Sequence, residues 1–123
     1  MDLMALPDNL RPESMLPLAE NDFPISQANP VTGYRTSLYR HGADADFLGW
    51  IQLTNGEDDA GYIYIRRPVA SPNLGSSGYV VMDVPPELLD ALLSILQSDE
   101  PLQIRFDKAS AASEASAFLE HRG

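Results

Sequence analysis

The sequence predicts an α+β fold in which an antiparallel β-meander of four to five strands is covered on one face by one main helix. Two observations predict it. Short runs rich in β-branched and aromatic residues recur at intervals of roughly ten to fifteen residues, with turn-forming residues between them. Farther along, leucine and isoleucine recur at steps of three and four residues over 88–96, a pattern typical of an amphipathic helix.

The expected strands are short, and each ends at residues that favour turns. Asn55-Gly56 closes the second run and favours a hairpin, because both residues tolerate positive φ. Within the later strands, apolar side chains alternate with polar or aromatic ones, which assigns one set to each face of the sheet. The predicted strands cover residues 34–40, 47–54, 62–67, 79–84 and 102–106.

The main helix is expected to begin at Pro85-Pro86-Glu87, because proline is favoured at the first helical position and an acidic residue suits the first turn. A second, short helix is predicted at the carboxyl end, with Ser110 as its cap. Its apolar side would hold Ala111, Ala115, Phe118 and Leu119. Residues 34–123 would then form a single α+β domain.

Residues 1–33 are predicted to form an extended proline-rich arm. They hold five of the ten prolines, which leaves no room for a long helix or a central strand. The arm is nevertheless too apolar for a pure linker, so part of it should lie along the domain or a partner. Its large apolar residues are Leu3, Met4, Leu10, Met15, Leu16, Leu18, Phe23 and Ile25.

The charge balance bears directly on the kind of partner. Eighteen acidic and eight basic residues give a net charge of −10, which opposes nucleic acid and anionic membranes and favours a basic protein partner. Without cysteine, disulfides and thiolate chemistry are excluded. The start of the chain lacks a signal-peptide pattern and no run has the roughly 20 apolar residues of a membrane span, so a cytoplasmic, non-membrane protein is expected. Self-association is left open.

Strand alternation predicts an exposed aromatic and arginine surface. If Phe47, Gly49, Ile51 and Leu53 face the helix together with Ile63 and Ile65, the opposite face of the sheet carries a different set of side chains. That face would present Trp50, Tyr62, Tyr64, Arg66 and Arg105.

Two kinds of partner use such surfaces. Tyrosine, tryptophan and arginine are frequent anchors of protein interfaces, and aromatic side chains also stack on single-stranded nucleic acid. The acidic charge favours the first, so the interpretation is a non-enzymatic acidic protein-binding or inhibitory module whose basic partner could itself bind nucleic acid. Single-stranded nucleic acid binding is the alternative. The partner-binding set comprises Trp50, Tyr62, Tyr64, Arg66, Arg105, Asp58, Asp59, Glu87 and Asp90.

No catalytic, cofactor or metal site is predicted. The acidic groups at 44–46 and 57–59 flank one strand and lie roughly 25 Å apart, too far to share a cation. The two histidines, His41 and His121, are far apart in the sequence, and no serine-nucleophile motif is present. A small enzyme with a site near His41 and the loop 69–78 is a second alternative to binding.

Overall fold

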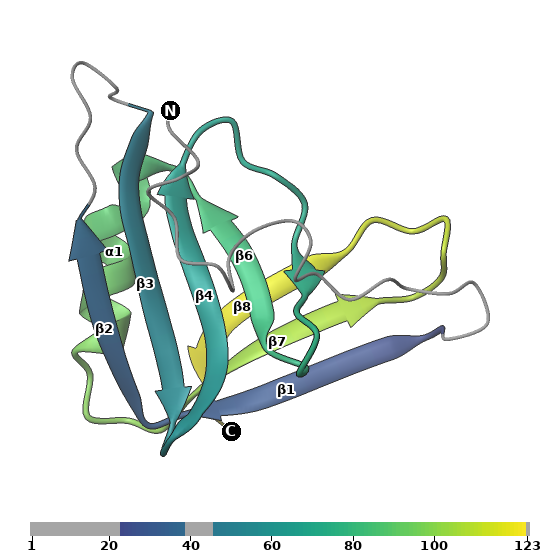
Figure 1. Cartoon of the computed structure of the whole chain (residues 1–123), viewed down its shortest axis with the longest axis horizontal. Helices are drawn as coiled ribbons and strands as arrows, with labels where there is room; N and C mark the ends of the chain where they lie inside the picture. The colour runs from purple at the N-terminus through teal and green to yellow at the C-terminus, as the bar shows by residue number, and fades with distance from the viewer. Residues whose placement is uncertain (1–22, 39–45, 123) are drawn as a thin grey trace.

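The computed structural model describes residues 23–38 and 46–122, which form two β-sheets and one short α-helix (Figure 1). One sheet has the strand order β1-β7-β8 and the other β2-β3-β4-β6-β5. The elements are β1 (Ile25–Val31), β2 (Gly33–Leu38), β3 (Phe47–Asn55), β4 (Asp58–Arg66), β5 (Asn73–Leu74), β6 (Val80–Val84), the 3₁₀ turn η5 (Pro86–Leu88), α1 (Leu89–Leu96), β7 (Leu102–Lys108) and β8 (Ser116–His121).

Neighbouring strands are antiparallel except for the pair β4 and β6. After β4 the chain runs back along the outer side of β6 as the short strand β5, then reverses and enters β6 in the same direction as β4. The reversal is fixed by Gly78 N–H, which donates to Gly75 O at 3.0 Å. The five-stranded sheet is therefore not a simple meander.

The two sheets meet at Thr32, the one residue between β1 and β2. Thr32 N–H donates to Thr54 O at 2.7 Å, and its Oγ1 accepts from Gly56 N–H at 2.9 Å. Both bonds reach the hairpin between β3 and β4. They fix the corner at which the chain leaves the three-stranded sheet and enters the five-stranded one.

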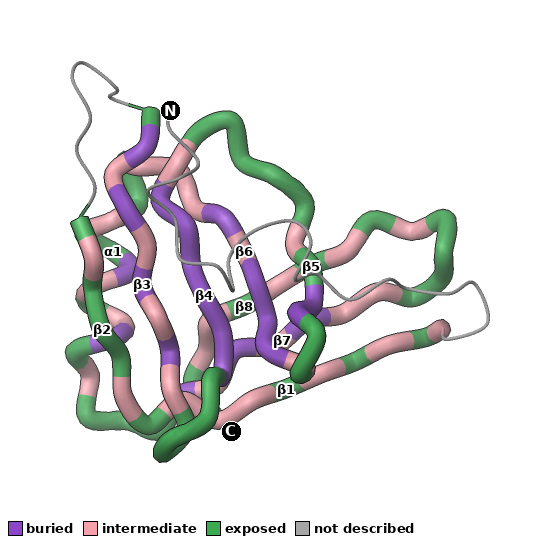
Figure 2. Tube along the Cα trace, viewed as in Figure 1, coloured by how far each residue is buried: buried purple, intermediate pink, exposed green. Residues whose placement is uncertain are grey.

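The main core lies between the two sheets and α1, and it follows the alternation expected from the sequence. In Figure 2 the buried stretches follow β3, β4 and β6. The inward positions predicted for Ile51, Leu53, Ile63 and Ile65 are confirmed, and alternate apolar residues of β6 and β7 belong to the same core. The fully or almost fully buried members include Ile51, Leu53, Ile63, Ile65, Val80, Leu92, Leu96, Leu102, Ile104 and Phe106.

Phe47 departs from this alternation. It was expected to face the helix, but it belongs to a cluster on the opposite side of the sheet. The pairing of β3 with β4 shifts between Phe47 and Gly49, and Gly49 has a φ of +142°. Such a bulge inserts a residue and reverses the facing of the side chains beyond it.

The structure does not show the predicted cover of one sheet face by a single main helix. The helix α1 has eight residues and buries Leu92 and Leu96, so it does not cover the sheet face as one main helix. The three-stranded sheet supplies much of that cover through Leu102, Ile104 and Phe106. The helical start at Pro86 is correct, as a 3₁₀ turn that leads into α1.

The C-terminal helix is wrong, because residues 116–121 form the strand β8. β8 pairs antiparallel with β7, and its Ala117 and Leu119 pack against the core while Ser116 and Phe118 point outward. Residues 25–31, placed in the arm by prediction, form β1. Pro30 is tolerated there because β1 is an edge strand with one partner, β7.

Ile104 links the two sheets and gives a direct test of the core. It is completely buried on β7, and a Cβ at Gly61 of β4 would lie 2.9 Å from its Cδ1 atom. Ile104→Ala should lower the free energy of unfolding by about 2 to 5 kcal/mol, measured by urea denaturation. Leu38→Ala, at a residue that is 77% exposed, should change it by no more than about 0.5 kcal/mol. Equal effects of the two substitutions would contradict this arrangement of the sheets.

Candidate binding surfaces

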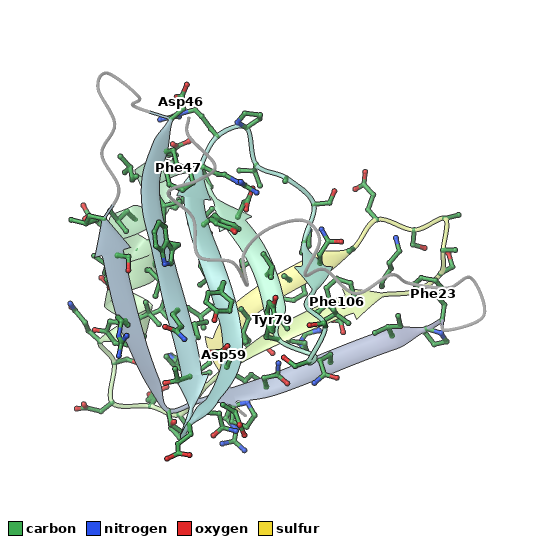
Figure 3. The ribbon with its side chains drawn as sticks, in the orientation of Figure 1. Phe23, Asp46, Phe47, Asp59, Tyr79 and Phe106 are labelled. Carbon is green, nitrogen blue, oxygen red and sulfur yellow. The ribbon has the colours of Figure 1, made fainter. Side chains whose placement is uncertain are left out.

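Five residues form what we call the aromatic cluster, on the face of the five-stranded sheet turned away from α1 and β7. They are Phe47, Tyr62, Tyr64, Tyr79 and Val81, with Trp50 packed against them. The rings of Tyr62 and Tyr79 meet edge to face at 5.2 Å between centroids. The rings of Phe47 and Tyr64 are 6.3 Å apart. Figure 3 shows Phe47 and Tyr79 toward opposite ends of this sheet.

The aromatic cluster is buried, which corrects the expectation of an exposed aromatic surface. Tyr62 and Tyr64 are each only 2% exposed, and Trp50 is half-buried. Their grouping on one face is correct, but their accessibility was wrongly predicted. Stacking on nucleic acid bases requires open rings. The single-stranded nucleic acid hypothesis therefore loses the surface on which it depended.

Arg66 lies on the same face but is held by an internal ion pair. Its Nε donates to Asp83 Oδ2 at 2.8 Å, and its guanidinium lies 4.3 Å from the centroid of the Tyr64 ring. The same Asp83 oxygen accepts from Ala70 N–H at 2.7 Å. Burial raises the pKa of Tyr64 above its usual range, and the positive charge of Arg66 opposes that shift. Asp83 therefore joins both the end of β4 and the loop after it to β6.

Arg67 makes a second, exposed set of ion pairs at the same end of the sheet. It contacts Asp46 Oδ1 and Glu87 Oε2, each at 3.0 Å. Glu87 was predicted to contact a partner, and it remains 60% exposed despite this pair. Asp90 is exposed on α1 and has no ion pair among the residues described. The charge of Glu87 is therefore partly offset by Arg67, whereas the charge of Asp90 is not offset by an ion pair among the residues described.

Arg105 does not share a surface with Trp50, because β7 belongs to the other sheet. Its guanidinium binds both carboxylate oxygens of Glu120, at 2.8 and 3.1 Å, and also pairs with Asp107. It stacks on Phe118, 4.3 Å from the ring centroid. The hydrogen bonds from Arg105 and Gln103 lower the pKa of Glu120 to about 2. The charge of Arg105 is therefore offset by acids of its own sheet.

The hairpin between β3 and β4 carries a group of three exposed acidic residues. Glu57, Asp58 and Asp59 are all exposed there and border a cleft of about 580 Å³. Asp59 accepts hydrogen bonds from Gln52 Nε2 at 2.7 Å and from the Tyr62 hydroxyl at 2.8 Å. Glu57 and Asp58 make no ion pair within the described ranges. The cleft is lined by Asn29, Pro30, Asn55, Glu57, Asp58, Asp59, Ala60, Ser77 and Gly78.

Asn29 of β1 holds the opposite wall of this cleft in place. Its Nδ2 donates to Ala60 O and to Gly78 O, both at 2.9 Å, while its Oδ1 accepts from Gln27 Nε2 at 2.6 Å. One side chain thus joins β1, the start of β4 and the turn before β6. We call this region, with its three carboxylates, the acidic cleft.

Sequence reasoning missed two of these positioning residues. Asp83 is a lone acid in an otherwise apolar strand, and its parity with Val81 places it beside Arg66. A single acid among apolar strand residues could therefore have indicated a buried ion pair from the sequence alone. Asn29 gave no such signal, because its contacts lie 31 and 49 residues away in the chain.

The predicted site near His41 lies outside the described residues, so that hypothesis stays a prediction. In the ranges 23–38 and 46–122 no group of three or more potential metal ligands occurs, and no helix is long and apolar enough to span a membrane. The chain matches no protein-family model, no curated protein and no solved structure.

The buried ion pair predicts a large effect at Asp83. Its side chain is 2% exposed, so Asp83→Ala would leave the charge of Arg66 and the N–H of Ala70 without an acceptor. We expect a loss of about 3 to 5 kcal/mol in the free energy of unfolding, measured by chemical denaturation. Asp90→Ala, which removes an exposed acid, should cost no more than about 0.5 kcal/mol. A loss at Asp83 as small as that at Asp90 would contradict the structural role of the pair.

Glu120 predicts a pH dependence of known sign. Because its pKa falls from 4.5 to about 2 on folding, the carboxylate stabilises the protein above pH 4.5, and this contribution is lost as the pH falls toward 2. Thermal unfolding should show Glu120→Gln to be less stable than the parent at pH 7, with the difference closing between pH 4.5 and 2. The exposed Glu114→Gln should show no such closing difference. A gap for Glu120→Gln that persists unchanged at pH 2 would argue against the ion pair.

Proposed function

We propose that this protein is a non-enzymatic binding module that takes a cationic segment of another protein into the acidic cleft. The observation that carries the proposal is the pair of exposed carboxylates, Glu57 and Asp58, beside a cleft of about 580 Å³. A cleft of this size lies within the range that holds peptide side chains and small ligands. Lysine and arginine side chains are the natural complement of its charge.

The distribution of basic residues supports this choice of partner. Arg66, Arg67 and Arg105 each pair with acids of the same chain, so their charges are offset locally. The acids at the tip of the β3–β4 hairpin have no such compensation among the described residues. With a net charge of −10, the molecule would attract a basic partner over a distance of about one Debye length, roughly 10 Å at 0.1 M salt.

The construction of the cleft also favours binding over free solvation. Asn29, bonded to Ala60 O and Gly78 O, holds the two walls in a fixed relation. Asp59 is oriented by Gln52 and Tyr62. Groups held in place before binding lose less conformational entropy when a partner arrives. Basic partners of this kind include nucleic-acid-binding proteins, which such a module would inhibit by occupying their cationic surface.

The proposal is tested with an octalysine peptide and the double variant Glu57→Gln/Asp58→Asn. Removing two exposed charges from the acidic cleft should weaken binding by about 3- to 10-fold, measured by isothermal titration calorimetry at low salt. The wild-type affinity should also fall steeply between about 0.05 and 0.5 M salt.

Asp99→Asn/Glu114→Gln is the matched control, because it removes the same charge from exposed positions that do not line the cleft. It should weaken peptide binding by less than about 2-fold. Equal loss in the two double variants would mean that net charge alone attracts the peptide, and the acidic cleft would then not be the binding site.

A further inference from the structure

Asn55 and Gly56 form the only Asn-Gly pair of the sequence, and they lie where β3 turns into β4 (Figure 1). Asn55 pairs with Asp58, and Gly56 has a φ of +65° in the turn between them. Both residues are exposed, and Asn55 lines the acidic cleft. No atom lies within 4 Å of the Cβ position of Gly56, so the space beside its backbone is open.

This pair of residues permits a covalent reaction. After the Gly56 nitrogen loses its proton to hydroxide, it can attack Asn55 Cγ, because the two atoms close a five-membered ring. The new N–C bond forms, the bond from Cγ to the side-chain nitrogen breaks, and that nitrogen takes a proton from water and leaves as ammonia. Water then opens one of the two N–C bonds of the cyclic imide and yields aspartate or isoaspartate. The net exchange consumes one water and releases one ammonia, without oxidation.

The hydroxyl of Thr32 restrains the attacking nitrogen. Thr32 Oγ1 accepts from Gly56 N–H at 2.9 Å and donates its own hydrogen to Thr54 O at 3.3 Å. Thr32 N–H donates to the same carbonyl at 2.7 Å. These bonds orient the hydroxyl so that it can accept from Gly56. Loss of the Gly56 proton breaks that hydrogen bond, which makes deprotonation less favourable.

We propose that Asn55 is a site of spontaneous deamidation and that Thr32 slows the reaction by holding Gly56 N–H. The site combines an exposed side-chain amide, a following residue without a side chain, and a single hydrogen bond that controls the attacking nitrogen. Asparagine is among the residues that proteins of hyperthermophiles use less, in keeping with its chemical lability.

The other asparagines of the described ranges lack this combination. Asn29 precedes Pro30, which has no N–H, and its Nδ2 is bonded to two backbone carbonyls. Asn73 precedes Leu74, whose side chain is buried in the core. Asn55 is therefore expected to react first among them.

Deamidation would increase the charge of the acidic cleft. Aspartate at position 55 places a fourth carboxylate beside Glu57, Asp58 and Asp59. Isoaspartate adds the same charge and also lengthens the main chain by a methylene where β3 pairs with β4. The effect on a cationic partner rests on the proposed function, whereas the modification itself does not.

Peptide mass spectrometry of the full-length protein, incubated at mildly alkaline pH, tests the site. The peptide that holds Asn55 should gain the mass of an amide-to-acid exchange. Thr32→Val should speed this exchange in the native protein by about 2- to 10-fold, the factor that corresponds to one hydrogen bond. Thr32→Ser keeps the hydroxyl and should react at the parent rate. No exchange at Asn55, or equal native rates for the parent and Thr32→Val, would overturn the proposal.

The same measurement in denaturing urea separates protection by Thr32 from a general loss of stability. Without the hairpin, the parent and Thr32→Val should react at one common rate, which exceeds that of the native parent. This comparison remains decisive if Thr32→Val folds poorly, because the parent alone supplies a native and an unfolded rate. Equal rates for the native and the unfolded parent would refute the protective role of Thr32.

Asn55→Asp tests the consequence for the acidic cleft. It should bind octalysine about 2- to 4-fold more tightly than the parent in calorimetry at low salt. Asn73→Asp adds the same charge at an exposed position outside the cleft and should leave the affinity unchanged. Failure of the parent to bind octalysine would refute the proposed function and leave the modification site intact. Binding by the parent with no gain for Asn55→Asp would refute the link between deamidation and the cleft.

Discussion

Burial of the five-stranded sheet on both faces is the constraint on which the rest of this structure depends. Six consecutive residues of β4, from Ala60 to Ile65, are buried, so neither side of its central strand faces water. The isoleucines on one side require the three-stranded sheet and α1. The tyrosines on the other side pack with Phe47 and Val81 in the aromatic cluster. Aromatic and β-branched side chains alternate along this strand because each set meets a different environment.

Strand alternation made much of the local structure predictable. The inward sets on β3, β4, β6 and β7, the hairpin at Asn55-Gly56 and the helical start at Pro86 all follow from local pattern. The division into two sheets does not, because β1 pairs with β7 across more than seventy residues. Residues 116–121 have a pattern that also fits a helix, and only the open edge of β7 makes them a strand.

The surfaces were harder to predict than the core. Alternation separates the two faces of a strand, but it does not say which face stays in water. Trp50, Tyr62 and Tyr64 were correctly grouped but wrongly predicted to be exposed, whereas Asp58 and Asp59, expected in a loop, are exposed at the start of β4. Arg105 was wrongly assigned to the same sheet as Trp50, because alternation within a strand does not show that β7 pairs with β1 and β8 in a separate sheet. Contacts such as those of Asn29, which join three distant segments, have no local signature.

The corner at Thr32 has a consequence for how the molecule loses its structure. One uninterrupted stretch of backbone contributes an edge strand to each sheet, and Thr32 is bonded to the hairpin of the second. Neither sheet can detach while the other keeps all its strands, since separation would pull β1 from β7 or β2 from β3. The two layers should therefore melt together, as one cooperative unit rather than as independent halves.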